Sequence, residues 1–383
     1  MAGLYLHIPF CVRKCGYCDF YSEDGKIGEL PSFLDALHGE ITLHSDGPFS
    51  RAETVETVFF GGGTPSLLDP GCVEDLLERI RRTFRLSDSP EITLEANPGT
   101  VDHDRLRGYR DAGVNRISLG VQSFSDADLQ VLGRLHTSAA GAKAVRAARQ
   151  AGFGNVGLDL IFGIPGQTPA DWEATVRTAL SFAPEHLSAY ALTVHPRTPL
   201  GRRIRSGEIA EPGEEILTAM FRNTADLLIA AGYDHYEVSN FAMPGRQCRH
   251  NLGYWTFLPY LGLGPSAHSF TEGKRFWNVA NLRDYTDRLN KNRLPVSGAE
   301  RIGRDRQRLE AIALGLRCRE GVLLDWIGKK DNLPQALSHQ AFGLREVMIQ
   351  RLIEEGIALI ENGSLKLTEK GFLLADAVAA ELA

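Results

Sequence analysis

The chain has 383 residues, of which 43% are hydrophobic and 23% charged, and its formal net charge is −6. This length predicts about two domains. The acidic balance argues against nucleic acid as a partner, because proteins that bind phosphate backbones carry an excess of Lys and Arg. No apolar run reaches transmembrane length and the first residues lack a signal-peptide pattern, so we expect a cytoplasmic protein.

Short apolar, β-branched runs alternate with helical patterns through the first two-thirds of the chain. The predicted strands are Leu4–Ile8, Thr57–Phe60, Glu91–Leu94, Asn115–Gly120, Asn155–Phe162 and His186–Leu192. The predicted helices between them include Leu30–Leu43, Cys72–Thr83, Ser138–Ala151 and Pro169–Phe182. Such alternation predicts an α/β fold with a parallel sheet and helices outside it. About six units are fewer than the eight of a closed TIM barrel, so we predict a partial (β/α)6 TIM-like barrel with its functional loops at the C-terminal ends of the strands.

The pattern of the chain changes after this barrel. A helix at Gly213–Ala231 and a strand at Tyr233–Ser239 complete a first domain, residues 1–242. For residues 243–294 we predict a linker or cap made of aromatic and glycine-rich loops. For residues 295–383 we predict a mainly helical, winged-helix-like domain. The elements expected in that last domain are helices at Asp305–Arg317 and Phe342–Glu355, a hairpin of Ile357–Glu361 and Ser364–Leu367 turning at Asn362-Gly363, and a final helix. The acidic balance favours a packing role for it over DNA binding.

Three of the six cysteines lie within eight residues, directly after the first predicted strand. Cys11, Cys15 and Cys18 form a C-x3-C-x2-C motif, whereas the other cysteines are scattered. Clustered cysteines in a reducing compartment are more often metal ligands than disulfides. A zinc site usually needs a fourth ligand, and no second pair appears. A [4Fe–4S] cube normally takes one thiolate for each iron, so three thiolates leave one iron open. The motif therefore predicts a [4Fe–4S] cluster whose free iron binds S-adenosylmethionine (SAM).

Further polar motifs fall at the ends of the following strands. Gly62 and Gly63 belong to a glycine run that lets backbone groups approach a ligand, although an ordinary tight turn is the alternative. Asp159 lies in an apolar strand, where a carboxylate is costly unless it is functional or pairs with an arginine. Arg134 is a candidate for the SAM carboxylate, and a surface arginine is the alternative. We expect Arg134 and Asp159 to lie away from the cluster loop.

Together these motifs resemble the coproporphyrinogen-oxidase-like branch of the radical SAM superfamily, and within it the haem chaperones, over nearly the whole chain. The likeness is carried by Tyr5-x-His7-Ile8-Pro9-Phe10-Cys11, Gly61-Gly62-Gly63-Thr64-Pro65-Ser66, Glu95-Ala96-Asn97-Pro98, residues 115–124, Leu135-His136, residues 159–165 and His250-Asn251-Leu252-Gly253-Tyr254-Trp255. The resemblance implies a SAM pocket lined by Tyr5, Tyr17, Gly62, Gly63, Thr64, Glu95, Gln122, Arg134 and Asp159.

One departure from this branch bears on activity. The oxygen-independent coproporphyrinogen III dehydrogenases that the chain resembles carry a fourth cysteine two positions after the third, and Phe20 occupies that position here. They also have a longer segment before the cluster loop, whereas this chain reaches Cys11 almost at once. Both differences argue against decarboxylation of coproporphyrinogen, and whether the chain is an enzyme is left open.

The block from His250 to Trp255 is a mark of the chaperone group and makes chemical sense as a haem site. His250 offers an imidazole for axial ligation of iron, and Tyr254 and Trp255 offer flat faces to a porphyrin. Cys248 is an alternative thiolate ligand, and a purely structural loop is the simpler interpretation.

The resemblance implies three cofactors or ligands: the [4Fe–4S] cluster, SAM and haem. Haem-accepting proteins are the implied partners, nucleic acid is not, and the sequence decides neither peripheral membrane association nor a homodimer. The leading hypothesis is a haem chaperone that delivers haem to haem proteins. The alternatives are a porphyrin-modifying radical SAM enzyme, such as the coproporphyrinogen dehydrogenase, and a nucleic-acid binder acting through the C-terminal domain.

Overall fold

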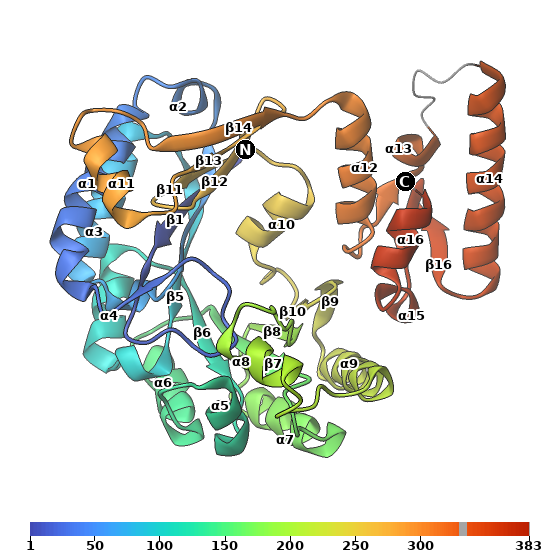
Figure 1. Cartoon of the computed structure of the whole chain (residues 1–383), viewed down its shortest axis with the longest axis horizontal. Helices are drawn as coiled ribbons and strands as arrows, with labels where there is room; N and C mark the ends of the chain where they lie inside the picture. The colour runs from blue at the N-terminus through green and yellow to red at the C-terminus, as the bar shows by residue number, and fades with distance from the viewer. Residues whose placement is uncertain (329–334, 383) are drawn as a thin grey trace.

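The computed structural model describes residues 1–328 and 335–382, and Figure 1 shows a large α/β unit with a smaller, mainly helical unit beside it. Six parallel strands form the centre of the large unit, in the spatial order in which they occur along the chain. They are β1 (Ala2–Ile8), β4 (Val55–Gly62), β5 (Leu86–Ala96), β6 (Arg116–Gln122), β7 (Val156–Phe162) and β8 (His186–Ala191). All six predicted strands are therefore confirmed.

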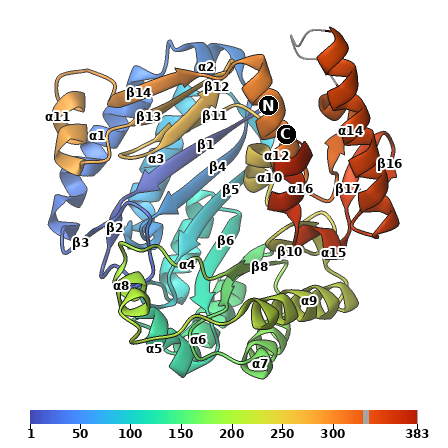
Figure 2. The ribbon, with the colours of Figure 1, turned by 45° about the vertical axis from the view of Figure 1, so that its right-hand side comes forward.

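Helices connect these strands and cover the outer face of the sheet (Figures 1 and 2). They are α1 (Leu30–Leu43), α2 (Pro48–Ala52), α3 (Pro70–Thr83), α4 (His103–Ala112), α5 (Asp126–Leu132), α6 (Ser138–Gln150) and α7 (Pro169–Leu180), followed by α8 (Pro199–Arg205) and α9 (Glu214–Ala230). The predicted helices between the strands are confirmed. Their starts follow from local capping: Thr168 and Asp171 form a reciprocal capping box at α7, and such a cap contributes about 1 kcal/mol.

The alternation of side chains along each strand separates a core from a cavity. In β1, Leu4, Leu6 and Ile8 are fully buried in the main hydrophobic core, whereas Tyr5 belongs to the opposite face and lines an internal cavity. Successive residues of a strand point to opposite faces, so a strand can pack against helices while offering polar groups to the interior. This division places the chemistry of the chain on the concave face of the sheet.

Further strands extend both edges of the parallel sheet. Beyond β8 lie β10 (Asn240–Ala242) and β9 (Asp234–Glu237), and beyond β1 lie β11 (Tyr260–Leu263), β12 (His268–Thr271), β13 (Lys274–Asn278) and β14 (Val296–Arg301). The result is a twelve-stranded sheet with β14 and β9 at its two edges, so within the described residues it stays open. The prediction of an α/β fold with six parallel strands in chain order and helices between them is confirmed.

The prediction of loops for residues 243–294 is wrong. This region contains the helices α10 (Arg249–Trp255) and α11 (Leu282–Leu289) as well as β11, β12 and β13. These strands are only four or five residues long and each contains an aromatic residue, so they show little alternation. Pairing decides their structure, because β11 lies parallel to β1 and the next two strands then add in antiparallel fashion.

A buried carboxyl group fastens this region to the barrel. Glu40 of α1 accepts hydrogen bonds from the N–H of Gly264 (2.7 Å), from the Asn278 amide (2.6 Å) and from the Tyr285 hydroxyl (2.6 Å). Burial raises the pKa of Glu40 to about 7. A single side chain thus joins α1 to the turn after β11, to β13 and to α11.

The C-terminal unit has its own hydrophobic core. It contains α12 (Arg304–Gly315), α13 (Leu324–Gly328), α14 (Gln335–Glu354), α15 (Glu369–Phe372) and α16 (Ala375–Leu382), with β15 (Val322–Leu323), β16 (Ala358–Glu361) and β17 (Ser364–Leu367). The predicted hairpin is confirmed, since β16 and β17 pair across Asn362 and Gly363, both with positive φ. The buried His235 bonds Glu369 (Nδ1–Oε2 2.5 Å) and so connects the two units.

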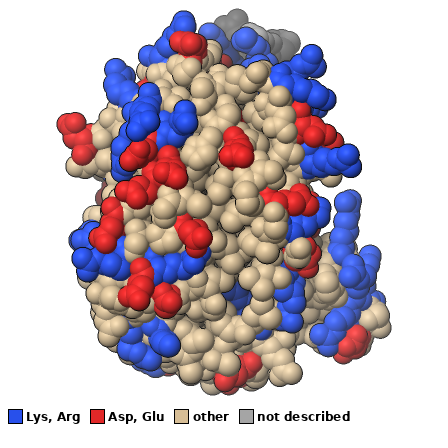
Figure 3. All heavy atoms as spheres, turned by 90° about the vertical axis from the view of Figure 1, so that its left-hand side faces the viewer, with Lys and Arg blue, Asp and Glu red and all other residues tan. Residues whose placement is uncertain are grey.

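The surface carries charges of both signs. Over the face shown in Figure 3, Lys and Arg side chains are interspersed with Asp and Glu. In the part of the chain that the structure describes, no helix is both long enough and apolar enough to span a membrane.

Glu40 gives a pH-dependent prediction. A carboxyl group with a pKa of about 7 in the fold, against 4.5 unfolded, stabilises the fold fully below pH 4.5 and loses that contribution as the pH rises through 7. Between pH 5 and pH 8 the unfolding free energy of the native chain should therefore fall relative to Glu40→Gln, by on the order of 3 kcal/mol at most. Urea unfolding at several pH values measures this difference.

The control is Asp35→Asn, an exposed residue of the same helix. Parallel pH profiles for the native chain and Glu40→Gln would show that Glu40 does not titrate in this range.

Candidate cluster and cofactor site

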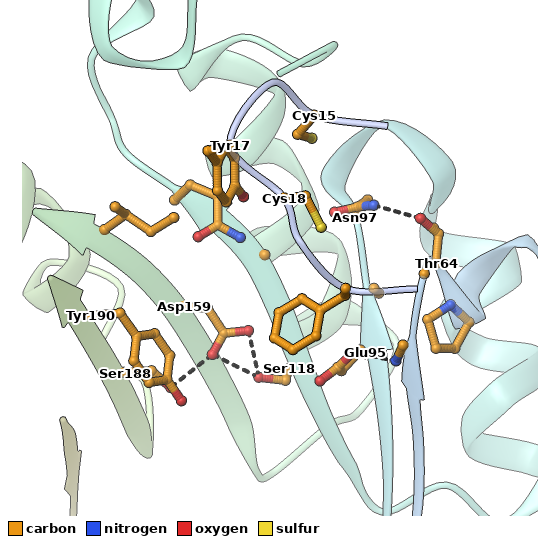
Figure 4. A pocket seen from close by; sticks show the side chains of 18 of the residues that line it. Cys15, Tyr17, Cys18, Thr64, Glu95, Asn97, Ser118, Asp159, Ser188 and Tyr190 are labelled. Carbon is orange, nitrogen blue, oxygen red and sulfur yellow. Dashed lines mark hydrogen bonds between the residues drawn. The ribbon is translucent and has the colours of Figure 1, made fainter. Parts of the chain in front are cut away.

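The concave face of the sheet encloses a cavity of about 680 Å³. Its walls come from β1 and from β4 to β8, and the cysteine loop lies at its mouth. Figure 4 shows Cys15, Tyr17 and Cys18 above side chains that project from neighbouring strands, among them Glu95 and Asp159. This volume lies within the range of roughly 300–1,000 Å³ that is typical of small-molecule sites.

The cysteine loop is held in place from several sides. Its first part, β2 (Phe10–Cys11), pairs with β3 (Glu23–Asp24). Arg13 donates to the carbonyl of Gly133 (3.0 Å), and the carbonyl of Gly16 accepts from the N–H of Leu200 (2.9 Å). The loop is therefore fixed to the ends of the barrel without help from any disulfide.

All three loop cysteines are free and partly exposed, and all three line the cavity. Among the described residues no three ligand-type side chains surround one point as the ligands of a single metal ion do. A [4Fe–4S] cube needs a different arrangement, with one thiolate for each iron. Three separate thiols that face one cavity, without a fourth cysteine, fit a cube with one open iron.

Two polar side chains contact the sulfur atoms directly. The hydroxyl of Thr64 donates to Cys11 (Oγ1–Sγ 3.5 Å), and the guanidinium of Arg134 donates to Cys15 (Nη1–Sγ 3.5 Å). Hydrogen bonds of this kind stabilise negative charge on sulfur and tune iron–sulfur clusters. Burial raises the pKa of Cys18, so a positively charged ligand would have to favour its thiolate.

The position of Arg134 differs from the prediction. It does not lie away from the cluster loop, because α5 ends at Gly133 in a left-handed turn that carries Arg134 back over Cys15. The guanidinium also donates to the carbonyl of Gly120 (2.7 Å) and to Asn97, while its buried Nε has no partner. Arg134 therefore connects the sulfur ligands with the ends of β5 and β6.

The glycine run packs tightly against β1. A Cβ on Gly62, whose φ is +109°, would lie 2.7 Å from the His7 ring, and a Cβ on Gly63 would lie 2.6 Å from the carbonyl oxygen of Phe10. Any side chain here would push the cysteine loop away from the sheet. Both glycines line the cavity. Glycine is therefore required here for two reasons: a side chain would clash with β1 and the cysteine loop, and it would block the approach of a ligand to the backbone.

Two acidic groups lie deeper in the cavity, with Ser118 between them (Figure 4). Asp159 accepts hydrogen bonds from Ser118 (3.0 Å) and Ser188 (2.7 Å), and Glu95 accepts one from the N–H of Gly62 (3.3 Å). Burial, together with the charge of Asp159, raises the pKa of Glu95 to about 8, and burial raises that of Asp159. At neutral pH Glu95 is thus largely protonated and can donate a hydrogen bond to a ligand.

The remaining residues of the predicted SAM pocket also line the cavity. Tyr5 bonds His7 (OH–Nδ1 3.0 Å), Tyr17 lies at the mouth, and Gln122 ends β6 with a φ of +66°. The structure thus brings all nine predicted residues to one cavity. Sequence reasoning missed other lining residues, including Asn97, Arg116, Ser118, His186, Ser188 and His195. The alternation of side chains along each strand could have found some of them, because Ser118 and Ser188 occupy the inward positions of β6 and β8.

His250 lies at the opposite end of the cavity from the cluster loop. Its Nδ1 bonds Thr57 near the start of β4 (2.7 Å), its Nε2 bonds Tyr254 (2.8 Å), and its ring stacks on Phe59 with a centroid distance of 5.0 Å. Burial, with the charge of Arg116, lowers the pKa of His250 to about 3. In this structure both ring nitrogens are engaged, so ligation of iron by His250 requires α10 to move.

The alternative ligand, Cys248, is fully buried and contacts Glu91 (Sγ–Oε1 3.7 Å). The same carboxylate accepts the first N–H groups of α10, from Arg249 and His250 (3.1 Å each). Glu91 therefore fixes the start of α10 at the N-terminal end of the barrel.

Residues 5–179 match the radical SAM superfamily, and residues 303–374 match the HemN C-terminal domain. A protein of Mycobacterium tuberculosis (strain H37Rv) named heme chaperone HemW is 39% identical over 386 residues, which cover 99% of this chain and 94% of that protein. A protein of the same name from Escherichia coli K12 is 43% identical over 275 residues, 71% of each chain.

Among solved structures, coproporphyrinogen III oxidase (HemN) from Escherichia coli, described as a radical SAM enzyme, gives a TM-score of 0.84. The match covers 100% of this chain and 89% of that one at 24% identity, which shows a common fold. Sequence identity of 39% across nearly the whole length shows a common family as well. The chain belongs to the HemW family, within the coproporphyrinogen-oxidase-like branch of the radical SAM superfamily.

Proposed function

We propose that this chain is a haem chaperone: it binds haem and delivers it to haem proteins, and it carries a [4Fe–4S] cluster that binds SAM. The observation that carries the proposal is the 39% identity, over 99% of the chain, to relatives named heme chaperone HemW. The composition of the cysteine loop supports it, since Phe20 stands where the dehydrogenases that the chain resembles have a fourth cysteine.

Cys11, Cys15 and Cys18 hold the cluster in this proposal. When bound, a cube with an open iron supplies a chelation site for the amino and carboxylate groups of SAM and a source of one electron. The chain supplies the surroundings: Thr64 and Arg134 donate to the sulfur atoms, the glycine run keeps the loop against β1, and Glu95 and Asp159 offer polar contacts below. Binding, orientation and exclusion of water are the tasks of the protein in cofactor chemistry.

His195 is the cavity histidine best placed to ligate haem iron without a conformational change. Three histidines line the cavity, and His186 and His250 are buried at its inner end, whereas the His195 side chain at the mouth is 47% exposed. Its Nδ1 lies 3.4 Å from a carboxylate oxygen of Asp19, and its Nε2 makes no hydrogen bond within the described residues. A carboxylate on one nitrogen and iron on the other is the usual arrangement of a metal-ligating histidine.

An apolar surface for the porphyrin lies next to His195 in the same wall. Phe20 follows Asp19 directly, lines the cavity and is 72% exposed. A large exposed aromatic ring is costly in water and is typical of binding surfaces. Haem bound here would lie beside the cluster loop, where occupancy of the cluster and SAM could control its release.

We also propose a cytoplasmic location, because the thiolates of an exposed cluster loop stay reduced in a reducing compartment. Vesicle flotation would test peripheral association with a membrane, and gel filtration would test whether a homodimer forms.

The cluster ligands are tested by replacing each cysteine with Ala. Loss of Cys11, Cys15 or Cys18 should abolish the absorption of the anaerobically reconstituted [4Fe–4S] cluster, because each thiolate holds one iron. Cys72→Ala is the matched control, since Cys72 is also partly exposed but lies on α3. A full cube in Cys15→Ala would rule out the assignment.

The SAM pocket is tested by Asp159→Ala. We expect at least tenfold weaker SAM binding, about 1.4 kcal/mol, with unchanged iron content, because Asp159 contacts serines rather than cluster sulfur. Arg134→Ala should lower both iron retention and SAM affinity, because Arg134 contacts Cys15. Equilibrium dialysis and iron analysis measure the two effects, with the exposed Asp111→Ala as the control. Native SAM affinity in Asp159→Ala would remove this residue from the pocket.

The haem proposal is tested by titration followed through the Soret band. The reconstituted chain should bind haem stoichiometrically and show no coproporphyrinogen decarboxylation. His195→Ala should shift the Soret band or weaken binding at least tenfold. His103→Ala is the matched control, because His103 is 48% exposed and pairs with Asp104 on α4, outside the cavity.

A native spectrum in His195→Ala with an altered one in His250→Ala would instead assign the iron to the block at α10. Efficient conversion of coproporphyrinogen, with no haem retained after gel filtration, would favour the dehydrogenase.

A further inference from the structure

The cavity continues below the residues expected to hold SAM. Arg116, Gly157 and His186 each precede by two residues an inward side chain of the same strand, namely Ser118, Asp159 and Ser188. Two residues of a strand span roughly 6–7 Å, so these three positions form a layer below the two serines and Asp159, and Arg116 and His186 of this layer line the cavity. Gly157 lies between its neighbours in the sheet, since it is in register with Ser118 on β6 and with His186 on β8.

A side chain at Gly157 would be surrounded by polar atoms. A Cβ built on this glycine would lie 3.4 Å from Nη2 of Arg116, 3.5 Å from Nδ1 of His186 and 3.3 Å from Oγ of Ser118. Three polar atoms from two neighbouring strands thus converge on one point beside β7. The close-up in Figure 4 shows Ser118 and Ser188 flanking Asp159 in the layer above.

Arg116 is a buried cation whose donors are not used. Arg116 is 2% exposed, and its Nε has no hydrogen-bond partner. Within the described part of the chain, the guanidinium makes no hydrogen bond or ion pair. The nearby carboxylates are engaged elsewhere: Glu91 accepts from the start of α10, and Asp159 accepts from Ser118 and Ser188. Burying a guanidinium without acceptors is costly, so the geometry calls for an acceptor from outside the chain.

His186 presents a second unused donor at the same point. It is 1% exposed, and its Nε2 lies 2.7 Å from the hydroxyl of Tyr236, which in turn accepts the N–H of Cys248 (3.3 Å). Tyr236 can therefore donate its own proton to Nε2, and the neutral ring then carries its proton on Nδ1. That Nδ1–H has no partner. Ser118 gives its proton to Asp159, so it offers only lone pairs.

We propose that the floor of this cavity is a binding subsite for a small organic carboxylate, held by the guanidinium of Arg116 and the Nδ1–H of His186 beside Gly157. A planar guanidinium matches the two oxygens of a carboxylate, and a second donor from another strand fixes its orientation. Glu91, Glu95, Asp159, Cys248, Tyr236 and His250 are other ionisable groups that interact with Arg116, and the carboxyl groups among them favour a ligand with a single anionic group. The subsite is separate from the proposed haem site and does not depend on it.

The test uses the reconstituted full chain with saturating SAM, with ¹³C-labelled acetate as the probe. Titration followed by NMR should show saturable acetate binding. Gly157→Ala should weaken it at least tenfold, because the added methyl group occupies the space while its contacts with Arg116 and His186 stay at ordinary van der Waals distance. Gly39→Ala is the matched control, since a Cβ there meets nothing within 4 Å.

Arg116→Gln should abolish acetate binding. If Arg116→Gln fails to fold, Gly157→Ala still tests the proposal. Acetate binding in Gly157→Ala equal to that of the native chain would overturn the proposal. So would equal displacement by chloride at the same ionic strength, or loss of acetate when SAM binds. Haem binding measured on the same samples reports on the chaperone function separately.

Discussion

The parallel pairing of β1 with β4 is the constraint on which the rest of the site depends. His7 is in register with Gly61 and Ile8 with Gly62, and the N–H of Gly63 bonds the carbonyl of Ile8 (2.8 Å). This register sets the cysteine loop, which leaves β1, directly against the glycine run, which leaves β4. Parallel strands end at the same edge of a sheet, so every later strand adds its own terminal residues to the same mouth.

The large unit buries several carboxyl groups, and their contacts explain how this burial is tolerated. Asp159 is bonded to two serines, Glu91 to the start of α10, and Glu40 to three donors from other elements. Burial raises the pKa values of Glu40 and Glu95, which reduces the charge that must be buried at neutral pH. Among the buried groups still without partners, Nε of Arg134, Nε of Arg116 and Nδ1 of His186 belong to residues of the cavity wall, where a ligand would satisfy them.

The block from His250 to Trp255 joins the two ends of the molecule. Its helix α10 contacts β1 and β4 on one side and α12 of the C-terminal unit on the other (Figures 1 and 2). His250 is bonded to a barrel strand and stacks on Phe59, so a change at the cavity floor and a change in the position of the C-terminal unit would both act on the same helix. The structure thus places this block between the barrel and the C-terminal unit.

The sequence by itself determined the parts of the chain whose signal is local. The six alternating strands, the helices between them, the hairpin at Asn362-Gly363 and the three cysteines follow from periodicity, turn chemistry and spacing over a few residues. Motif likeness then supplied the nine residues of the predicted SAM pocket, which all line one cavity.

Only the tertiary structure decided what depends on groups far apart in the chain. The short strands after residue 243 form because β1 offers an unpaired edge, and Arg134 reaches Cys15 because α5 ends in a left-handed turn. The unpartnered donors of Arg116 and His186 have no sequence signature, because a missing hydrogen bond becomes visible only when all potential partners have been placed. Periodicity predicts which face of a strand a residue occupies, whereas long-range packing decides what that residue meets there.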